Sequence, residues 1–288
     1  MTSEEIIAEA SSILHSEINA ATPEGLFWRW AYHTGTLNDL ARLRAALLAQ
    51  CSTPARVALR GVILGALHGP KTKTFASYFS NQCPRTYAPK PGYAVEFWRV
   101  RGLKPQFVDV LSVIARRAER YFSALPAASG LIRHSDSRVT GSLTPDTFTD
   151  NFDWIITSPP YYGMRTYIPD QWLRNWFVGG PDRVEYSDQS QLSHSAPRNF
   201  IDDLRAVWRN AATVSSTTAR LVIRFGGIRD RKVDPLHLIK ASLIDSGWTL
   251  RTIQAAGSAI SGRRQADAFL RGSSAPRCEY DLWAHLIA

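Results

Sequence analysis

One short stretch limits the folds open to this chain more than any other. The apolar run 154–156 leads directly into Ser158-Pro159-Pro160-Tyr161. The length and β-branched content of the run predict a buried strand. The two prolines cannot donate hydrogen bonds to a neighbouring strand, so the strand has to end there and the chain has to turn. Ligands of α/β proteins bind beyond the carboxyl ends of strands, so we expect this turn to face a ligand. The simpler alternative is a strand followed by a rigid turn.

The part of the chain after Pro126 alternates between strand and helix patterns. Strands are predicted over residues 130–136, 152–157, 219–225, 248–254 and 279–287, and helices over 170–177, 199–212 and 235–246. The first of these strands ends in an acid, Asp136. Such alternation is typical of a mainly parallel sheet with helices on its faces, and therefore of the α/β class.

The preceding part of the chain is predicted to be mostly helical. Apolar residues recur at helical spacing over 3–21, 37–50, 53–68 and 105–125. Residues 69–102 are instead irregular, and combine aromatic side chains with cations that include Lys71, Lys73 and Arg85. This mixture suits nucleic-acid contacts, because cations meet phosphates and rings stack on bases, and it suits a pinned surface linker equally well. We expect a helical region with a basic loop over 1–104 and a catalytic region over 105–288.

Composition indicates what kind of partner the chain binds and in which cellular compartment it works. The formal net charge of +9 favours a polyanion partner such as DNA, although a merely basic soluble protein is the alternative. The chain has no apolar run of membrane-spanning length and no signal-peptide pattern, so we expect a cytoplasmic protein with no membrane association. Cys51, Cys83 and Cys278 are widely spaced, and neither they nor the histidines show metal-ligand spacing. No disulfide and no metal site are therefore expected.

Residues 105–288 resemble the amino-methyltransferases of DNA, most closely the type that methylates N4 of cytosine. Ser158-Pro159-Pro160-Tyr161 is similar to motif IV of many N4-cytosine enzymes, which a Gly-x-Arg-x-Tyr run often follows, as residues 163–167 do here. His134-Ser135-Asp136 resembles the third motif of the family, and Gly226-Gly227 and Gly247-Trp248 resemble its later motifs. The implied fold is an incomplete Rossmann-like methyltransferase sheet preceded by a helical region.

The resemblance also implies the chemistry and the residues that carry it. S-adenosylmethionine would be the cofactor, and the target base would be flipped out of the duplex, as in restriction–modification enzymes. Ser158 and the Pro159 carbonyl would accept from the amine, Pro160 completes the catalytic motif, and Tyr161 would stack on the base. Asp136 and Ser158 would contact the cofactor. The candidate DNA contacts are Arg165, Lys71, Lys73, Arg85, Arg263 and Arg264.

Two other functions stay open. The family usually has Asp or Asn at position 158 when adenine is the target, so N6-adenine methylation is an alternative that Ser158 disfavours. A DNA-recognition subunit without catalysis is the second alternative, and the intact motif argues against it. Methylation at carbon 5 would need a cysteine after a proline, whereas Cys83 precedes Pro84.

One expected motif is missing from the sequence. The family's first motif is a strand with a Gly-rich turn that holds the methionine part of the cofactor, and we find no such pattern. In the family's sheet, the first two strands lie between the strand ending at Asp136 and the strand ending at Thr157. A sheet without them would have an unpaired edge, which is costly. We expect a second polypeptide to supply these strands and most of the cofactor pocket, or a longer chain to carry them. The surfaces expected to recognise DNA are residues 69–102, 179–198 and 255–276.

Overall fold

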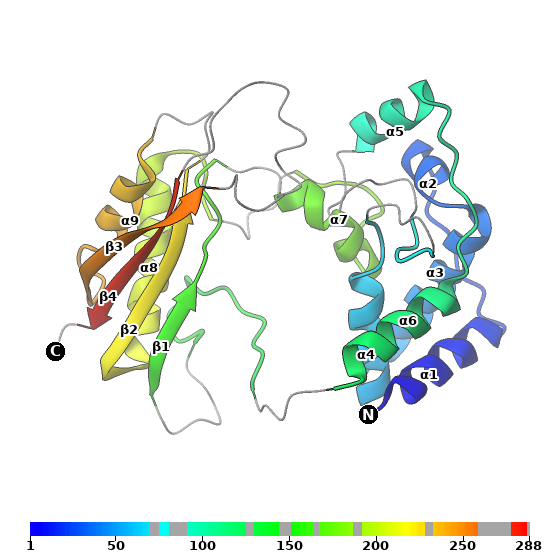
Figure 1. Ribbon diagram of the computed structural model, residues 1–288, viewed down its shortest axis with the longest axis horizontal. Coiled ribbons are helices and arrows are strands. Elements are labelled where there is room, and N and C mark those ends of the chain that lie inside the picture. Colours follow the sequence, from blue (N-terminus) through cyan, green and yellow to red (C-terminus); the bar gives the residue numbers. More distant parts are fainter. Residues whose placement is uncertain are drawn as a thin grey trace. The chain divides into compact units, whose positions relative to one another are not determined.

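The chain forms two compact units in the computed structural model (Figure 1). The structure describes residues 1–69, 75–80, 91–124, 130–143, 151–163, 167–186, 192–227, 233–258 and 278–286. The first unit, here called the helical unit, comprises residues 1–129 and 166–187. The second, the sheet unit, comprises residues 130–165 and 188–288. The division differs from the expected boundary at residue 104, because residues 105–129 and 166–187 group with the helices.

The helical unit contains seven of the described helices. They are α1 (Ser3–His15), α2 (Leu26–Ala31), α3 (Thr34–Ala49), α4 (Pro54–Leu64), α5 (Pro91–Val100), α6 (Val110–Phe122) and α7 (Tyr167–Phe177). Helix α1 begins in a capping box, in which Thr2 and Glu5 satisfy each other's backbone N–H groups. Thr53 caps α4 in front of Pro54, and Asp109 caps α6. The expected helices are therefore present; α1, α4 and α6 are shorter than expected, whereas α3 begins three residues earlier and is longer.

Large aromatic side chains form the centre of the helical unit. The Trp28 ring of α2 lies 4.6 Å from the Trp176 ring and 5.4 Å from the Trp172 ring, both of α7. The guanidinium of Arg44 in α3 donates to the Trp176 carbonyl at 2.7 Å. These contacts explain why α7, which lies far along the chain, belongs to this unit.

Helix α5 corrects one expectation. Residues 69–102 were expected to be irregular, but Pro91–Val100 is helical. Ala94 and Trp98 are buried, and their spacing of four residues places both on the face that packs against α2. Pro91 and Gly92 stand at the first two positions of this helix, where they are tolerated.

The sheet unit holds the expected α/β core, with a mixed sheet. Its elements are β1 (Phe152–Thr157), α8 (Pro197–Thr213), β2 (Ser215–Gly226), α9 (Pro235–Leu243), β3 (Trp248–Ser258) and β4 (Cys278–Leu286). The strand order is β1-β2-β4-β3. Strand β1 pairs in parallel with β2, whereas β4 is antiparallel to both β2 and β3. The expectation of a mainly parallel sheet is thus met only at the β1–β2 pair.

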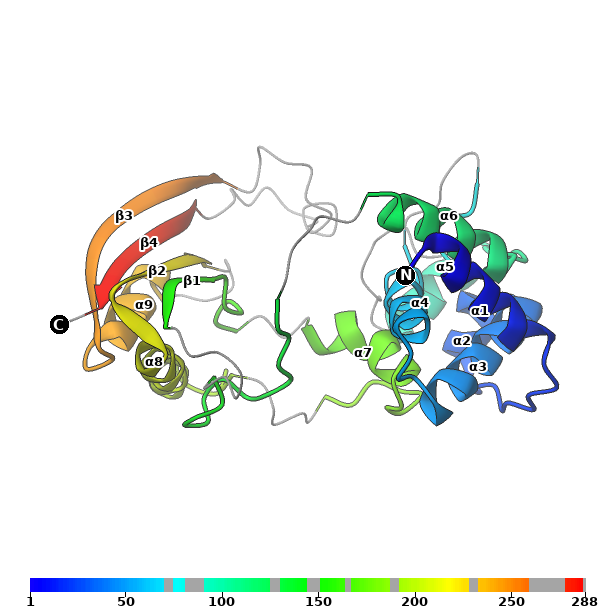
Figure 2. The same ribbon diagram turned by 90° about the horizontal axis from the view of Figure 1, so that it is seen from below.

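Helices α8 and α9 lie on the same side of the sheet (Figure 2). Side chains of β2 alternate, so that Leu221, Ile223 and Phe225 are buried in one core with those helices. Arg220 and Arg224 project from the opposite face of β2 and are exposed. On that face, the rings of Trp154 and Trp283 meet edge to face at 6.2 Å. We call it the open face, because neither α8 nor α9 covers it.

The segment 130–136 does not form the predicted strand. No strand is assigned to it within the described residues, and Ile132 is 96% exposed. A β-strand is stable only when a neighbour takes up its backbone hydrogen bonds. The prediction of a strand over 130–136 was therefore wrong, because a strand pattern in the sequence gives a strand only where a neighbouring strand pairs with it.

Candidate active site

Ser158-Pro159-Pro160-Tyr161 follows β1 directly, as the sequence predicts. Because β1 and β2 are parallel and Thr157 is opposite Ile223, this motif lies beside the carboxyl end of β2. Pro159 is buried, and Pro160 and Tyr161 are half-buried. The Ser158 side chain is exposed, and its hydroxyl makes no hydrogen bond within the part of the chain that the structure describes. The motif therefore offers a hydroxyl to a ligand from a fixed turn.

The Tyr161 side chain is held by contacts from two other strands. Its hydroxyl donates to the Glu279 carboxylate of β4 at 2.7 Å. Its ring meets Phe225 of β2 edge to face, with centroids 5.2 Å apart. Gly226, the last residue of β2, lies against the same ring: a Cβ atom built at this position would be only 3.3 Å from a ring atom. Residues far apart in the sequence thus determine where the ring lies.

Glu279 is the residue of this site that sequence reasoning missed. It is only 8% exposed, which is unusual for a carboxylate. Next to it on β4, Asp281 accepts two hydrogen bonds of 2.8 Å from Arg224. These bonds lower the pKa of Asp281 and raise that of Arg224. The only signal for Glu279 in the sequence was its position at the start of a mostly apolar predicted strand, two residues before Asp281.

The turn after Tyr161 is fixed by the segment before α8. Gly163 has a φ of 80°, which only glycine adopts without strain, and its N–H donates to Nδ1 of His194 at 2.9 Å. The Tyr162 ring meets Phe200 of α8 edge to face at 5.4 Å. The motif is therefore anchored on both sides of its turn, by β2 and by the beginning of α8.

Asp136, the expected cofactor acid, is bound by a cation of its own loop. Both of its carboxylate oxygens accept from the Arg138 guanidinium, at distances of 2.7 to 3.1 Å. These hydrogen bonds lower the pKa of Asp136 to about 2. Arg138 also reaches Asp203 of α8 at 3.3 Å, and Asp203 accepts from the Ser193 N–H. Through Arg138 and Asp203, Asp136 is thus linked to Ser193, the neighbour of His194. Both carboxylate oxygens of Asp136 already accept hydrogen bonds from Arg138.

The expected DNA contacts cannot be placed. Lys71, Lys73, Arg85, Arg165, Arg263 and Arg264 all lie outside the described residues. The described cations near the expected surface over 69–102 are held by rings or acids of their own unit. The Arg101 guanidinium lies 3.9 Å from the Phe97 ring centroid, and Arg99 pairs with Glu96 at 2.9 Å.

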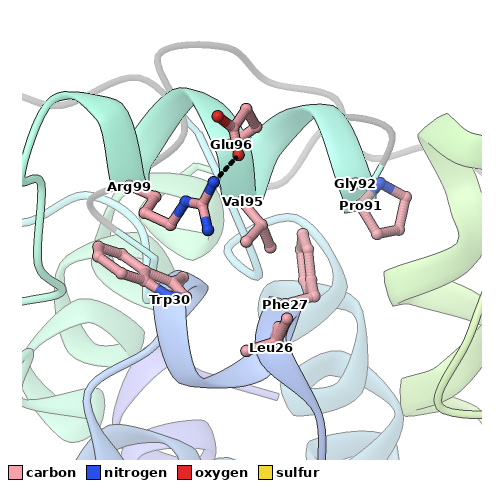
Figure 3. A pocket seen from close by; sticks show the side chains of 8 residues that line it. All are labelled: Leu26, Phe27, Trp30, Pro91, Gly92, Val95, Glu96 and Arg99. Carbon is pink, nitrogen blue, oxygen red and sulfur yellow. Dashed lines mark ion pairs between the residues drawn. The ribbon is translucent and has the colours of Figure 1, made fainter.

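The helical unit carries a groove of about 370 Å³ between α2 and α5 (Figure 3). Its lining residues are Leu26, Phe27, Trp30, Pro91, Gly92, Val95, Glu96 and Arg99. Glu96 and Arg99 neutralise each other at its rim, so the lining has no excess of positive charge. A phosphate backbone would find little attraction there.

Comparison with known proteins adds no assignment. No family model matches the chain, and no curated protein sequence matches it. Among the described residues, no helix has the length and apolar character needed to span a bilayer. The same residues contain no group of three or more His, Cys, Asp or Glu side chains able to hold a metal ion.

Proposed function

We propose that this chain is a subunit of an S-adenosylmethionine-dependent DNA methyltransferase that acts on the N4 amine of a flipped cytosine. The observation that carries the proposal is Ser158-Pro159-Pro160-Tyr161 at the carboxyl end of a parallel strand. This is the end of a sheet where α/β proteins bind ligands. A hydroxyl exposed on a rigid turn, next to a ring oriented by β2 and β4, suits a planar base with an exocyclic amine.

Methyl transfer requires the protein to hold the cytosine amine in a fixed orientation. The nitrogen lone pair of cytosine is delocalised into its ring, so acceptors have to hold the N–H bonds while the lone pair faces the methyl group. Ser158 and the Pro159 carbonyl are the candidate acceptors, and Tyr161 is the candidate stacking surface. S-adenosylmethionine, when bound, supplies the methyl group. Direct transfer then depends on positioning and electrostatics.

The described residues suit the base better than the cofactor. Asp136 is the only acid that the motif order assigns to the cofactor, and both of its oxygens already accept from Arg138. The motif order offers no Gly-rich turn after a strand. This mismatch supports a cofactor pocket built mainly by a second polypeptide.

The edge of the sheet supports the same partner. In the described part of the chain, β1 pairs only with β2, so its other edge can accept a further strand. On the open face next to that edge, Ile156 is 75% exposed and Trp154 48%. We propose that the partner adds a strand to β1 and covers these side chains, as strand addition does in other complexes.

The test is methyl transfer by the complex that co-purifies with the full chain. Tritiated S-adenosylmethionine and unmodified DNA are supplied, and the product nucleosides are separated. The expected product is N4-methylcytosine, and Ser158→Ala should lower its rate about 100-fold, as the loss of a transition-state hydrogen bond does. Ser123→Ala, an exposed serine of the helical unit, is the control.

Other results would assign the chain differently. N6-methyladenine as the product would establish the adenine alternative. Methylation that survives both Ser158→Ala and Tyr161→Ala unchanged would make this chain a DNA-recognition subunit without catalysis.

A further inference from the structure

We infer that Glu279 and Gly226 are positioning residues that fix the Tyr161 ring in the orientation needed for stacking. The inference rests on the proposed function. Glu279 belongs to no motif identified in the sequence, and Gly226 was identified only as part of a later motif, with no role at Tyr161. Neither residue forms a hydrogen bond with the Ser158 hydroxyl within the described part of the chain. Both act through Tyr161, from strands that follow the motif by 65 residues or more in the numbering.

The first part of the argument is the tether. The phenol of Tyr161 donates to a carboxylate that is 8% exposed, at 2.7 Å, which is the length of a strong charge-assisted hydrogen bond. A carboxylate removed from water in this way needs partners, and Tyr161 is one of them. The hydrogen bond fixes the outer end of the side chain, while the backbone turn after Pro160 fixes its inner end.

The second part is the close approach of the backbone at Gly226. A Cβ atom there would lie 3.1 Å from Cγ of Glu279 and 3.3 Å from Cε2 of Tyr161. A side chain at this position would therefore displace the ring or the carboxylate by a few tenths of an ångström, whereas glycine lets both pack against the end of β2. Phe225 meets the ring at 5.2 Å and limits its rotation on another side.

The consequence is preorganisation. A tyrosine on a turn ordinarily samples several rotamers, and a base that stacks on it has to select one of them. A ring already held in one orientation removes that cost, and keeps the amine at the angle that transfer requires. The effect should appear in kcat more than in the affinity for DNA, because phosphate contacts provide most of that affinity.

The experiment uses conservative variants in the co-purified complex. Tyr161→Phe keeps the ring and removes the tether, and should lower kcat about 10-fold with KM for DNA changed less than about 2-fold. Glu279→Ala should cause the same loss, whereas Glu279→Gln, which keeps an acceptor, should restore most of the rate. The double variant Tyr161→Phe/Glu279→Ala should be no slower than either single variant, because both remove one interaction.

Tyr162→Phe is the matched control. Its ring is next in the sequence and packs on Phe200, and its hydroxyl has no hydrogen bond within the described residues. Its kcat should stay within about 2-fold of the wild type. Additive losses in the double variant, or equal losses in Tyr162→Phe and Tyr161→Phe, would overturn the positioning role.

A second measurement does not depend on methylation. In the full chain labelled with 13Cζ-tyrosine, the resonance that Tyr161→Phe removes belongs to Tyr161. It should shift in Glu279→Ala and stay in place in Tyr162→Phe. An unmoved resonance in Glu279→Ala would overturn the tether even if the complex methylates DNA. Absence of methylation in the wild-type complex would instead refute the proposed function. The resonance of Tyr161 would still show whether Glu279 holds its hydroxyl.

Discussion

The two units of this chain differ in where their exposed apolar side chains lie. In the helical unit, exposed apolar residues are spread over several helices and loops, for example Leu26, Val57 and Val100. In the sheet unit, β1 carries three of them in alternation, at Phe152, Trp154 and Ile156, and the others are Leu131, Ile132, Val139 and Ile244. Scattered apolar residues are normal on protein surfaces, whereas contiguous ones mark interaction sites. The proposed partner would therefore bind the sheet unit at β1.

The largest expected effect tests this difference directly. Ile156→Lys would place a charge at the centre of the proposed interface, and should weaken binding of the co-purifying polypeptide at least about 30-fold. Val57→Lys makes the same change on α4, where the side chain is 49% exposed, and should leave binding unchanged. Affinity can be measured by titrating one purified polypeptide into the other.

The thermal midpoint of each isolated variant is the control for folding. Both midpoints should match the wild type, because both positions are exposed in the isolated chain. Equal affinities for Ile156→Lys and Val57→Lys would mean that the face of β1 is ordinary surface, and the contrast between the units would be lost.

Truncating one buried leucine in each unit tests whether the partner stabilises the sheet unit alone. Leu43→Ala in the helical unit and Leu221→Ala in the sheet unit each remove a side chain that is 0% exposed, and should each cost about 2–5 kcal/mol of unfolding free energy. In denaturant titrations, the partner should offset the loss in Leu221→Ala only, since it binds only the folded sheet unit. Equal protection of both variants would contradict a partner that binds one unit.

The smallest expected effect concerns the loop that carries Asp136. Its pKa is lowered to about 2, chiefly by hydrogen bonds from Arg138, and its side chain is 37% exposed. A lowered pKa in the folded state stabilises the fold above the pKa of the unfolded state, and this contribution disappears as the pH falls toward 2. Asp136→Asn should therefore cost at most about 1 kcal/mol near neutral pH and less at pH 3. A cost that does not change between these pH values would show that ionisation is not its source.

The sequence predicted the local features of the sheet unit well, for a physical reason. Strand β1 and its end at Thr157, before the two prolines, follow from β-branched residues and from proline chemistry, which act over a few residues. The strand was expected to be buried, and this was wrong, because Trp154 and Ile156 on one of its faces are exposed. The helices α8 and α9 follow from their periodicity and from the prolines at their first turns. These are short-range effects, so that the sequence alone could reveal them.

What the sequence could not predict depends on distant neighbours. The contact between Tyr161 and Glu279 spans 118 residues, and no spacing rule connects them. The segment before Asp136 has the composition of a strand, but the structure assigns no strand there, so the prediction was wrong. The antiparallel insertion of β4 between β2 and β3 is likewise a property of the whole sheet. Local pattern predicts elements, whereas pairing partners decide whether and how they join.

The central claim is that this chain carries the base-binding half of a methyl-transfer site and needs a second polypeptide for the other half. The most direct test measures tritiated methyl transfer to DNA by the purified chain alone, by the co-purifying polypeptide alone, and by the two together. The account predicts transfer to cytosine only by the mixture, with no tight binding of S-adenosylmethionine by this chain alone. A monomer of this chain that binds S-adenosylmethionine tightly and methylates DNA unaided would contradict it.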